Sequence, residues 1–178
     1  MKTEFGEALV VDDEVNLRES LVELIAGEGF RVAQASNGEE AVESLRKATV
    51  DPDVVFLDVR MPKMDGLEVL RVIQEEKLTS APVIVLSAFG DSSKMIAAMR
   101  LGAYDYLTKP LDLDEIVATL RRAVEQRRLG RAAELARPAK DVAGADGIAA
   151  DPNAFEMLGT SRVMRDVFKQ IGRVAGTD

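Results

Sequence analysis

Four short apolar runs of the sequence are each followed by polar side chains that could do chemistry together. Asp12 and Asp13 follow the first of these runs, Asp58 follows another, and Ser87 and Lys109 follow two more. If the runs are parallel strands of an open sheet, their carboxyl ends meet at one edge. Three carboxylates gathered there repel one another unless a cation or an ammonium group neutralises them. The set predicts a magnesium site, because Mg²⁺ takes oxygen ligands and keeps exchangeable waters.

A carboxylate beside such an ion can attack a phosphoryl group to give an aspartyl phosphate. Lys109 would then pair with the phosphoryl oxygens, and the hydroxyl of Ser87 would donate a hydrogen bond to them. Taken singly, an acidic residue after a strand is usually a turn or cap residue, but four strand ends together are hard to explain in that way. The chain has no histidine and no cysteine, which excludes imidazole and thiolate chemistry.

The elements that must position these residues follow from the hydrophobic pattern. Short β-branched runs alternate with apolar residues at helical spacing, and two of the runs are continuously apolar, as in strands buried on both faces. This predicts an α/β fold with five βα units and a doubly wound, five-stranded parallel sheet. The expected strands are 8–11, 31–34, 53–57, 82–86 and 104–107. Asn37 and Glu40 resemble a capping box, and Gly29 and Gly102 lie where helices would end.

Composition and charge limit the classes of function. The 178 residues allow one full domain with a remainder. Residues 1–120 carry 23 acidic and 12 basic side chains, a net charge of −11 that repels nucleic acid and suits a bound cation. The basic stretch 121–140 could touch DNA, but the Ala and Leu between its charges favour a solvated helix. No apolar stretch approaches the roughly 18 residues of a membrane span, and the start lacks a secretion signal, so we expect a cytoplasmic protein without membrane contact.

Four motifs together carry a resemblance to a known family. The motifs are Val11-Asp12-Asp13-Glu14, Phe56-Leu57-Asp58-Val59-Arg60-Met61-Pro62-Lys63-Met64-Asp65-Gly66, Leu86-Ser87-Ala88 and Tyr104-Asp105-Tyr106-Leu107-Thr108-Lys109-Pro110. Over about residues 6–125 the chain resembles the receiver domain of bacterial two-component response regulators. The resemblance implies a flavodoxin-like fold, with residues 1–125 as a phosphoacceptor domain. The combination of motifs is specific, whereas the Asp-Asp pair alone would be weak.

The resemblance also implies roles for individual residues. Asp58 would take a phosphoryl group from a phosphohistidine on a sensor histidine kinase; lacking histidine, this chain cannot be the donor. Asp13, the Asp58 carboxylate and the backbone carbonyl of Arg60 would hold Mg²⁺, with Asp12 acting through a water. Lys109 would pair with the phosphoryl group.

The resemblance further implies a switch. Ser87 occupies the switch hydroxyl position, where Thr is commoner in the family. Tyr106 matches the switch aromatic, which would swing inward when Ser87 moves towards the phosphate. The surface formed by the fourth helix, the fifth strand and the fifth helix should then change. The Lys109–Pro110 peptide bond is expected to be cis.

The fifth helix is expected to begin after Asp112 and to run to Ala136, roughly 24 residues. Its part beyond Val124 would have little of the domain to pack on. Leu129 and Leu135 therefore predict a partner helix, and we expect a homodimer through the fifth helix and a linker at 126–150. A frayed linker is the alternative, given Gly130 and the many arginines nearby.

Residues 151–178 are similar to the opening of the AAA+ ATPase domain of sigma-54-dependent transcription activators of the nitrogen-regulator type. The chain ends before a phosphate-binding loop, so we expect a signalling switch and not an enzyme, with DNA and sigma-54 polymerase contacted only through domains missing from this chain. A response regulator with a different output domain is the alternative. A pure dimerisation module with a vestigial pocket is disfavoured, because all the pocket residues are present. A haloacid-dehalogenase phosphatase is also disfavoured, because such enzymes carry Asp-x-Asp after their first strand, whereas Asp12 and Asp13 are adjacent here.

Overall fold

The structure is a computed structural model of the chain, and it describes residues 6–136, with the side chains described as far as residue 132. The part of the expected linker beyond residue 136 and the ATPase-like segment expected at 151–178 lie outside the described residues, as does the side chain of Leu135. In the described part, no helix is long and apolar enough to cross a membrane.

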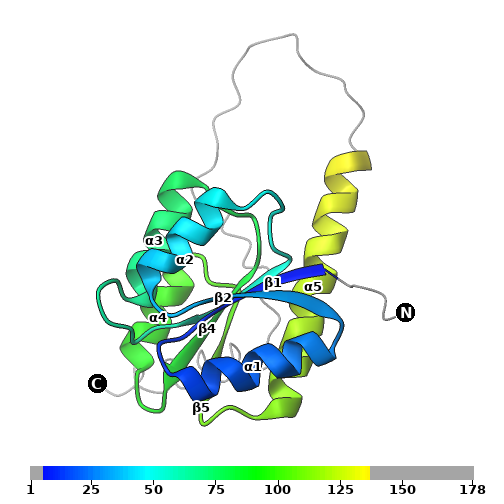
Figure 1. Cartoon of the computed structure of the whole chain (residues 1–178). Coiled ribbons are helices and arrows are strands. Elements are labelled where there is room, and N and C mark those ends of the chain that lie inside the picture. Colours follow the sequence, from blue (N-terminus) through cyan, green and yellow to red (C-terminus); the bar gives the residue numbers. More distant parts are fainter. Residues whose placement is uncertain (1–5, 137–178) are drawn as a thin grey trace, which may run out of the picture. The chain divides into compact units, whose positions relative to one another are not determined.

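Five parallel strands form a single sheet in the order β2-β1-β3-β4-β5 (Figure 1). The strands are β1 (Gly6–Val11), β2 (Phe30–Ala35), β3 (Val54–Asp58), β4 (Val83–Ala88) and β5 (Asp105–Lys109). The chain leaves β1 for β2 on one side and returns to β3 on the other, so the strand order reverses between β1 and β3. A doubly wound sheet binds its ligands at such a reversal, outside the carboxyl ends of the strands. The predicted fold class is therefore confirmed.

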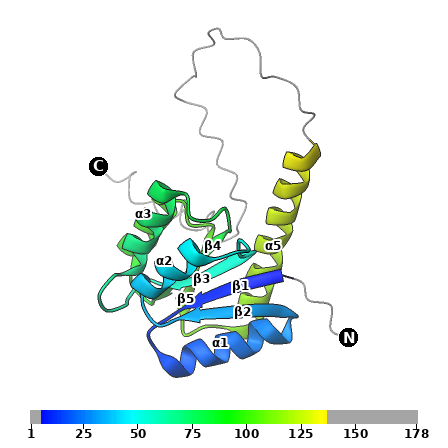
Figure 2. The ribbon, with the colours of Figure 1, turned by 45° about the horizontal axis from the view of Figure 1, so that its top comes forward.

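Five helices cover the two faces of this sheet (Figure 2). They are α1 (Val15–Gly27), α2 (Gly38–Lys47), α3 (Gly66–Glu76), α4 (Ser92–Arg100) and α5 (Leu113–Ala136). Apolar side chains of α1 and α5 pack in one cluster with one face of the sheet, and those of α2, α3 and α4 pack in a second cluster with the other face. Phe56, in the middle strand, has no exposed surface. Burying a side chain of this kind contributes roughly 1.5–3 kcal/mol.

Three site residues lie inside strands, although the sequence pattern placed them just after strands. Asp58 is the last residue of β3 and pairs with Leu86, while Ser87 pairs with Thr108 and Lys109 with Ala88. The apolar pattern ends before the hydrogen-bonded ladder does, because polar residues at the carboxyl end still pair their backbones. The ends of β3, β4 and β5 read from hydrophobicity are therefore one to two residues short.

Gly29 and Gly102 follow the ends of α1 and α4 as expected, and the capping of α2 differs in one respect. The side chain of Asn37 accepts a hydrogen bond from the backbone N–H of Glu40 at 3.1 Å, as a cap should. The Glu40 carboxylate, however, accepts from the N–H of Ser36 at 2.8 Å and not from that of Asn37. Gly29, just after α1, has a φ of +96°, which Gly adopts without strain.

The helix α5 runs to Ala136 as expected, but the expectation that it has little to pack on beyond Val124 is wrong. The side chain of Arg127 is 3% exposed and lies 2.6 Å from a carboxylate oxygen of Asp51, with Asp53 at 3.5 Å. Arg131 donates to Asp53 at 2.9 Å. Both aspartates belong to the segment before β3, at the amino end of that strand, whereas Asp58 is at its carboxyl end. The basic stretch is thus partly an internal ion-pair network and not only a solvated face.

A close approach of backbone to backbone fixes the start of α3 against β3. The N–H of Gly66 donates to the carbonyl of Val59 at 3.0 Å. A Cβ at Gly66 would lie 2.3 Å from the carbonyl oxygen of Asp58 and 2.9 Å from the Cα of Val59. Only glycine fits there without moving the strand end that carries Asp58.

We therefore expect Gly66→Ala to lower the free energy of unfolding by about 1–3 kcal/mol, because the backbone must shift to admit a methyl group. Urea unfolding of the full chain measures this. Gly130→Ala is the matched control: its Cβ would meet nothing within 4 Å inside α5, so the same change should stabilise by up to about 1 kcal/mol. An unchanged free energy of unfolding in Gly66→Ala would show that the backbone admits the methyl group without cost.

Candidate functional site

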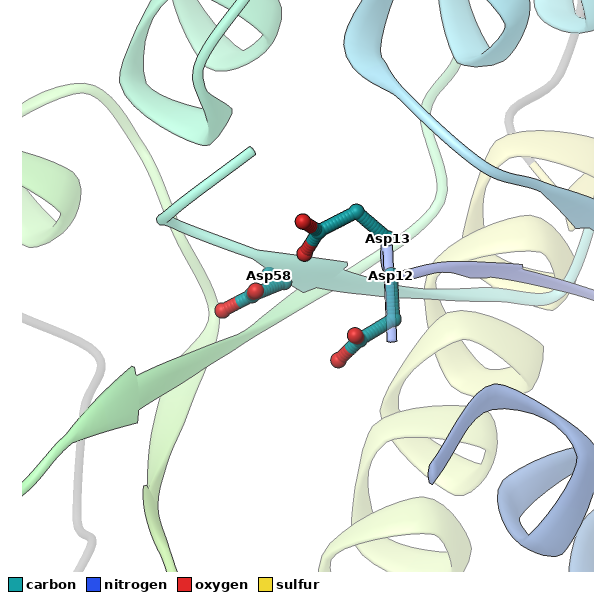
Figure 3. Close-up of side chains that lie close together, drawn as sticks. All are labelled: Asp12, Asp13 and Asp58. Atoms are coloured by element: carbon teal, nitrogen blue, oxygen red, sulfur yellow. The ribbon is translucent and has the colours of Figure 1, made fainter. Parts of the chain in front are cut away.

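Three carboxylates converge at the point where the strand order reverses. Oxygens of Asp12, Asp13 and Asp58 lie within 4.8 Å of one another, and the side chains project from the ends of the neighbouring strands β1 and β3 (Figure 3). The sequence predicted this convergence from strand ends alone. Asp12 and Asp58 are buried, whereas Asp13 is exposed, so the cluster has a closed side and a side open to solvent.

Asp12 is held by hydrogen bonds on both carboxylate oxygens. Its Oδ1 accepts from the backbone N–H of Glu14 at 2.9 Å, and its Oδ2 accepts from Nζ of Lys109 at 2.9 Å. Arg18, on α1, donates to the backbone carbonyl of Asp12 at 2.6 Å. With both oxygens engaged, Asp12 is better suited to hold other groups in place than to bind an ion directly.

Asp58 is surrounded by groups with opposing effects on its charge. Burial raises the pKa of its carboxyl group, the Lys109 ammonium opposes this, and the Asp12 charge adds to it, with a raised pKa as the net result. Nζ of Lys109 lies 3.2 Å from the Asp58 carboxylate, and the backbone N–H of Arg60 donates to that carboxylate. More positive charge at this point would therefore favour the ionised, nucleophilic form.

Lys109 remains an ammonium group in this site. Burial opposes its charge, but the hydrogen bond to Asp12 and the charges of Asp58 and Asp12 outweigh burial, so its pKa is raised. One ammonium facing three carboxylates leaves an excess of negative charge. A divalent cation that prefers oxygen ligands fits this donor set, and Mg²⁺ is such an ion.

The hydroxyl of Ser87 is a buried polar group that lacks a partner. Ser87 has no exposed surface, and its Oγ makes no hydrogen bond within residues 6–136. An unpaired buried hydroxyl costs free energy, so such groups call for an explanation. Ser87 follows Leu86, whose backbone is paired with that of Asp58 in the sheet, so the free hydroxyl lies one strand away from the carboxylate cluster.

Tyr106 lies inside the protein in this structure. It is 8% exposed and packs in the cluster shared with α2, α3 and α4, and burial raises the pKa of its phenol. The inward swing expected of this ring stays a prediction, because the ring is already buried here. The Lys109–Pro110 peptide bond is cis, as the resemblance implied.

Sequence reasoning missed two contributors to the site. Arg18 supports the backbone of Asp12 from α1, and the side chain of Arg60 forms an ion pair with Asp91, at the start of α4. No sequence signal identifies the contact that either side chain makes, because charged residues on helices and loops are common and their partners lie elsewhere in the chain. The sequence pattern predicted no role for Gly66, although Asp65 and Glu68 around it have the spacing of a capping box, which the structure shows at the start of α3.

Comparison with known proteins agrees with this geometry. The family model for the response regulator receiver domain matches residues 8–121, which is more than half of the chain. The chain belongs to the response regulator receiver family. Receiver domains of this family are signalling switches.

Longer transcriptional regulators match most of this chain. The chain is 35% identical over 173 residues to the DNA-binding transcriptional regulator NtrC of Escherichia coli K12, covering 96% of this chain and 33% of that protein. It is 35% identical over 178 residues to the transcriptional regulatory protein ZraR of Klebsiella oxytoca, covering all of this chain and 37% of that one. The chain thus spans about a third of the length of the curated relatives it matches.

Solved structures agree with the receiver fold. A response regulator receiver domain from Clostridium thermocellum matches with a TM-score of 0.64 and 31% identity, covering 69% of this chain and 97% of that one. NtrX from Brucella abortus, crystallised in complex with ATP, matches with a TM-score of 0.68 and 29% identity, covering 97% of this chain and 35% of that one.

The unpaired hydroxyl of Ser87 gives a prediction that needs no phosphoryl donor. We expect Ser87→Ala to leave the free energy of unfolding unchanged or to raise it by up to about 1 kcal/mol, because it removes a buried group without a partner. Urea unfolding measures the change. As control, Thr79→Val removes a hydroxyl that donates to Asp51 and accepts from the N–H of Ala81, and should cost about 1–2 kcal/mol. A comparable loss for Ser87→Ala would mean that its hydroxyl already has a partner.

Proposed function

We propose that this receiver takes a phosphoryl group onto Asp58 from a phosphohistidine of a partner sensor histidine kinase. One observation carries the proposal: the buried Asp58 carboxylate lies 3.2 Å from the Lys109 ammonium and next to the strand that holds the unpaired hydroxyl of Ser87. A nucleophile, a cation and a free hydrogen-bond donor are the groups that phosphoryl transfer to a carboxylate requires.

The transfer step is simple to write. An oxygen of Asp58 forms a bond to phosphorus while the nitrogen–phosphorus bond of the phosphohistidine breaks. The electron pair stays on the imidazole nitrogen, which leaves as histidine after taking a proton from solvent. The ammonium group of Lys109 donates a hydrogen bond to a phosphoryl oxygen, and the hydroxyl of Ser87 donates a hydrogen bond to another. Asp12 keeps Lys109 in place throughout, because it holds Nζ by a hydrogen bond.

We assign a metal-holding role to Asp13, Asp58 and the backbone carbonyl of Arg60, with Asp12 acting through a water. The exposure of Asp13 and the hydrogen bonds already made by both Asp12 oxygens support this division. When bound, Mg²⁺ supplies positive charge that offsets the carboxylates and the incoming phosphoryl oxygens. Burial, first of all, raises the pKa of Asp58, and positive charge nearby would oppose that effect.

The output of the switch follows from the position of Ser87 and Tyr106. Tyr106 lies on β5, and Ser87 on β4 pairs with Thr108 of β5. Phosphorylation adds charge and acceptor oxygens that can bias the surface of α4, β5 and α5. By analogy with the relatives, we propose that α5 carries the change to a sigma-54-activator ATPase in a longer protein, which would contact DNA and sigma-54 polymerase. A different output domain is the alternative. No observation favours the haloacid-dehalogenase phosphatase.

Labelling tests the acceptor. With acetyl phosphate and Mg²⁺, the full chain should gain the mass of one phosphoryl group, and Asp58→Asn should abolish the gain because the amide is not a nucleophile. Chelating the Mg²⁺ should also suppress it. Intact-mass spectrometry provides the measurement.

Asp112→Asn serves as the matched control, since Asp112 is an acidic residue outside the cluster whose side chain accepts from the backbone N–H groups of Asp114 and Glu115. Its labelling should equal that of the original chain. Full labelling of Asp58→Asn would contradict the assignment of the acceptor, and labelling that survives chelation would contradict the metal.

We also propose a homodimer through the far half of α5. Leu129 is 63% exposed on a part of α5 that Arg127 and Arg131 hold against the domain, so it presents an apolar group in a fixed position. Leu129→Glu should lower the mass measured by sedimentation at high protein concentration towards that of a monomer. Leu113→Glu, equally exposed at the start of α5, should not. Equal masses for all three chains would remove the proposed interface.

A further inference from the structure

The side chain of Arg60 leaves the acidic cluster and binds the start of α4. Its Nε donates to Oδ2 of Asp91 at 2.8 Å, and its Nη2 donates to Oδ1 at 2.7 Å. This two-pronged ion pair connects the loop between β3 and α3 with the loop between β4 and α4. Both oxygens of the Asp91 carboxylate are occupied by one guanidinium group.

Asp91 stands at the N-cap position of α4, yet it does not cap the helix. Asp is among the residues preferred there, because its carboxylate accepts from the N–H groups of the first turn. The side chains of Asn37, Asp65 and Asp112 do this for α2, α3 and α5. Asp91 makes no such bond. Asp91 is therefore a candidate cap whose carboxylate is bound by Arg60 instead, and its ψ of 41° differs from the extended backbone of Asn37 and Asp65.

The backbone of Arg60 belongs to the phosphoryl-acceptor site. Its N–H donates to the Asp58 carboxylate, two residues earlier in the chain. Its side chain is 58% exposed and that of Asp91 is 18% exposed, so solvent screens the ion pair and the partners can exchange. A phosphoryl group on Asp58 would carry a charge of about −2 and three acceptor oxygens. Guanidinium groups bind such oxygens with two hydrogen bonds at once.

We propose that the Arg60–Asp91 ion pair is a latch that a phosphoryl group on Asp58 opens. In the closed state, seen here, Arg60 holds Asp91 away from the first turn of α4. In the open state, Arg60 binds the phosphoryl oxygens, and the freed Asp91 carboxylate caps α4. The inference rests on the proposed function, because it needs the phosphoryl group on Asp58.

The latch gives the site a second connection to α4. The path through Ser87 and Tyr106 depends on the movement of a hydroxyl and a ring. The latch depends on charge, and it strengthens one end of α4 by providing acceptors that its first-turn N–H groups lack. Asp91 can cap α4 only when Arg60 does not bind it. The presence of the cap therefore depends on whether Arg60 binds Asp91 or the phosphoryl group.

The latch can be opened without phosphate by substitution. In the full chain, Arg60→Met should slow the solvent exchange of the Ser93 and Lys94 amide protons about fivefold, the effect of gaining a typical N-cap, as measured by NMR. A merely structural ion pair predicts the opposite sign, because its loss would loosen α4 and speed exchange. Unchanged or faster exchange in Arg60→Met overturns the proposal.

Two controls separate capping from a general effect of charge. The double variant Arg60→Met with Asp91→Ala cannot form the cap, so its amides should not slow; slowing that persists there overturns the latch. Arg46→Met breaks a similar two-pronged pair with Glu76, between α2 and α3, and should leave the α4 amides unchanged.

The phosphoryl arm tests the proposed trigger. With excess acetyl phosphate and Mg²⁺, labelled molecules of the original chain should show the same slowing at Ser93 and Lys94, and labelled Asp91→Ala molecules should not. If no label attaches, the proposed function fails, and Arg60→Met still decides whether the ion pair withholds the cap. If label attaches and these amides do not slow, the latch alone fails.

Discussion

The repulsion among three carboxylates is the constraint on which the rest of this structure depends. The parallel strands bring Asp12, Asp13 and Asp58 within 4.8 Å of one another, two of them buried. Like charges at such distances cannot all stay ionised without compensation. The protein supplies the ammonium of Lys109 and backbone N–H groups, which is enough to order the cluster but not enough to neutralise it. The remaining deficit of positive charge makes the site receptive to a cation.

The sequence predicted the architecture well because the architecture depends on local patterns. Continuous apolar runs identified β3 and β4 as buried strands, and helical spacing gave the α-helices between strands. The chain order of a doubly wound sheet then placed the strand ends at one edge, so the acidic cluster followed from topology. The exact ends of strands did not follow, because Ser87 and Lys109 pair through their backbones, and backbone pairing is independent of side-chain polarity.

What the sequence could not supply are properties that depend on neighbours distant in the chain. Asp12 and Asp13 are identical in type and adjacent, yet one is buried with both oxygens engaged and the other is exposed. The sequence pattern does not indicate that the hydroxyl of Ser87 lacks a hydrogen-bond partner in the described residues. The burial of Arg127 was equally hidden, because an arginine in a basic helical stretch is normally solvated.

The burial of Arg127 fixes how the far half of α5 lies against the domain. Its ion pairs with Asp51 and Asp53 hold the helix at the amino end of β3, away from Asp58. Arg131, one turn later, forms a further ion pair with Asp53. A helix fastened at that end leaves the domain along a set direction and with a set rotation about its own axis. The course of α5 as far as Arg131 therefore depends on two aspartates that lie away from the acidic cluster.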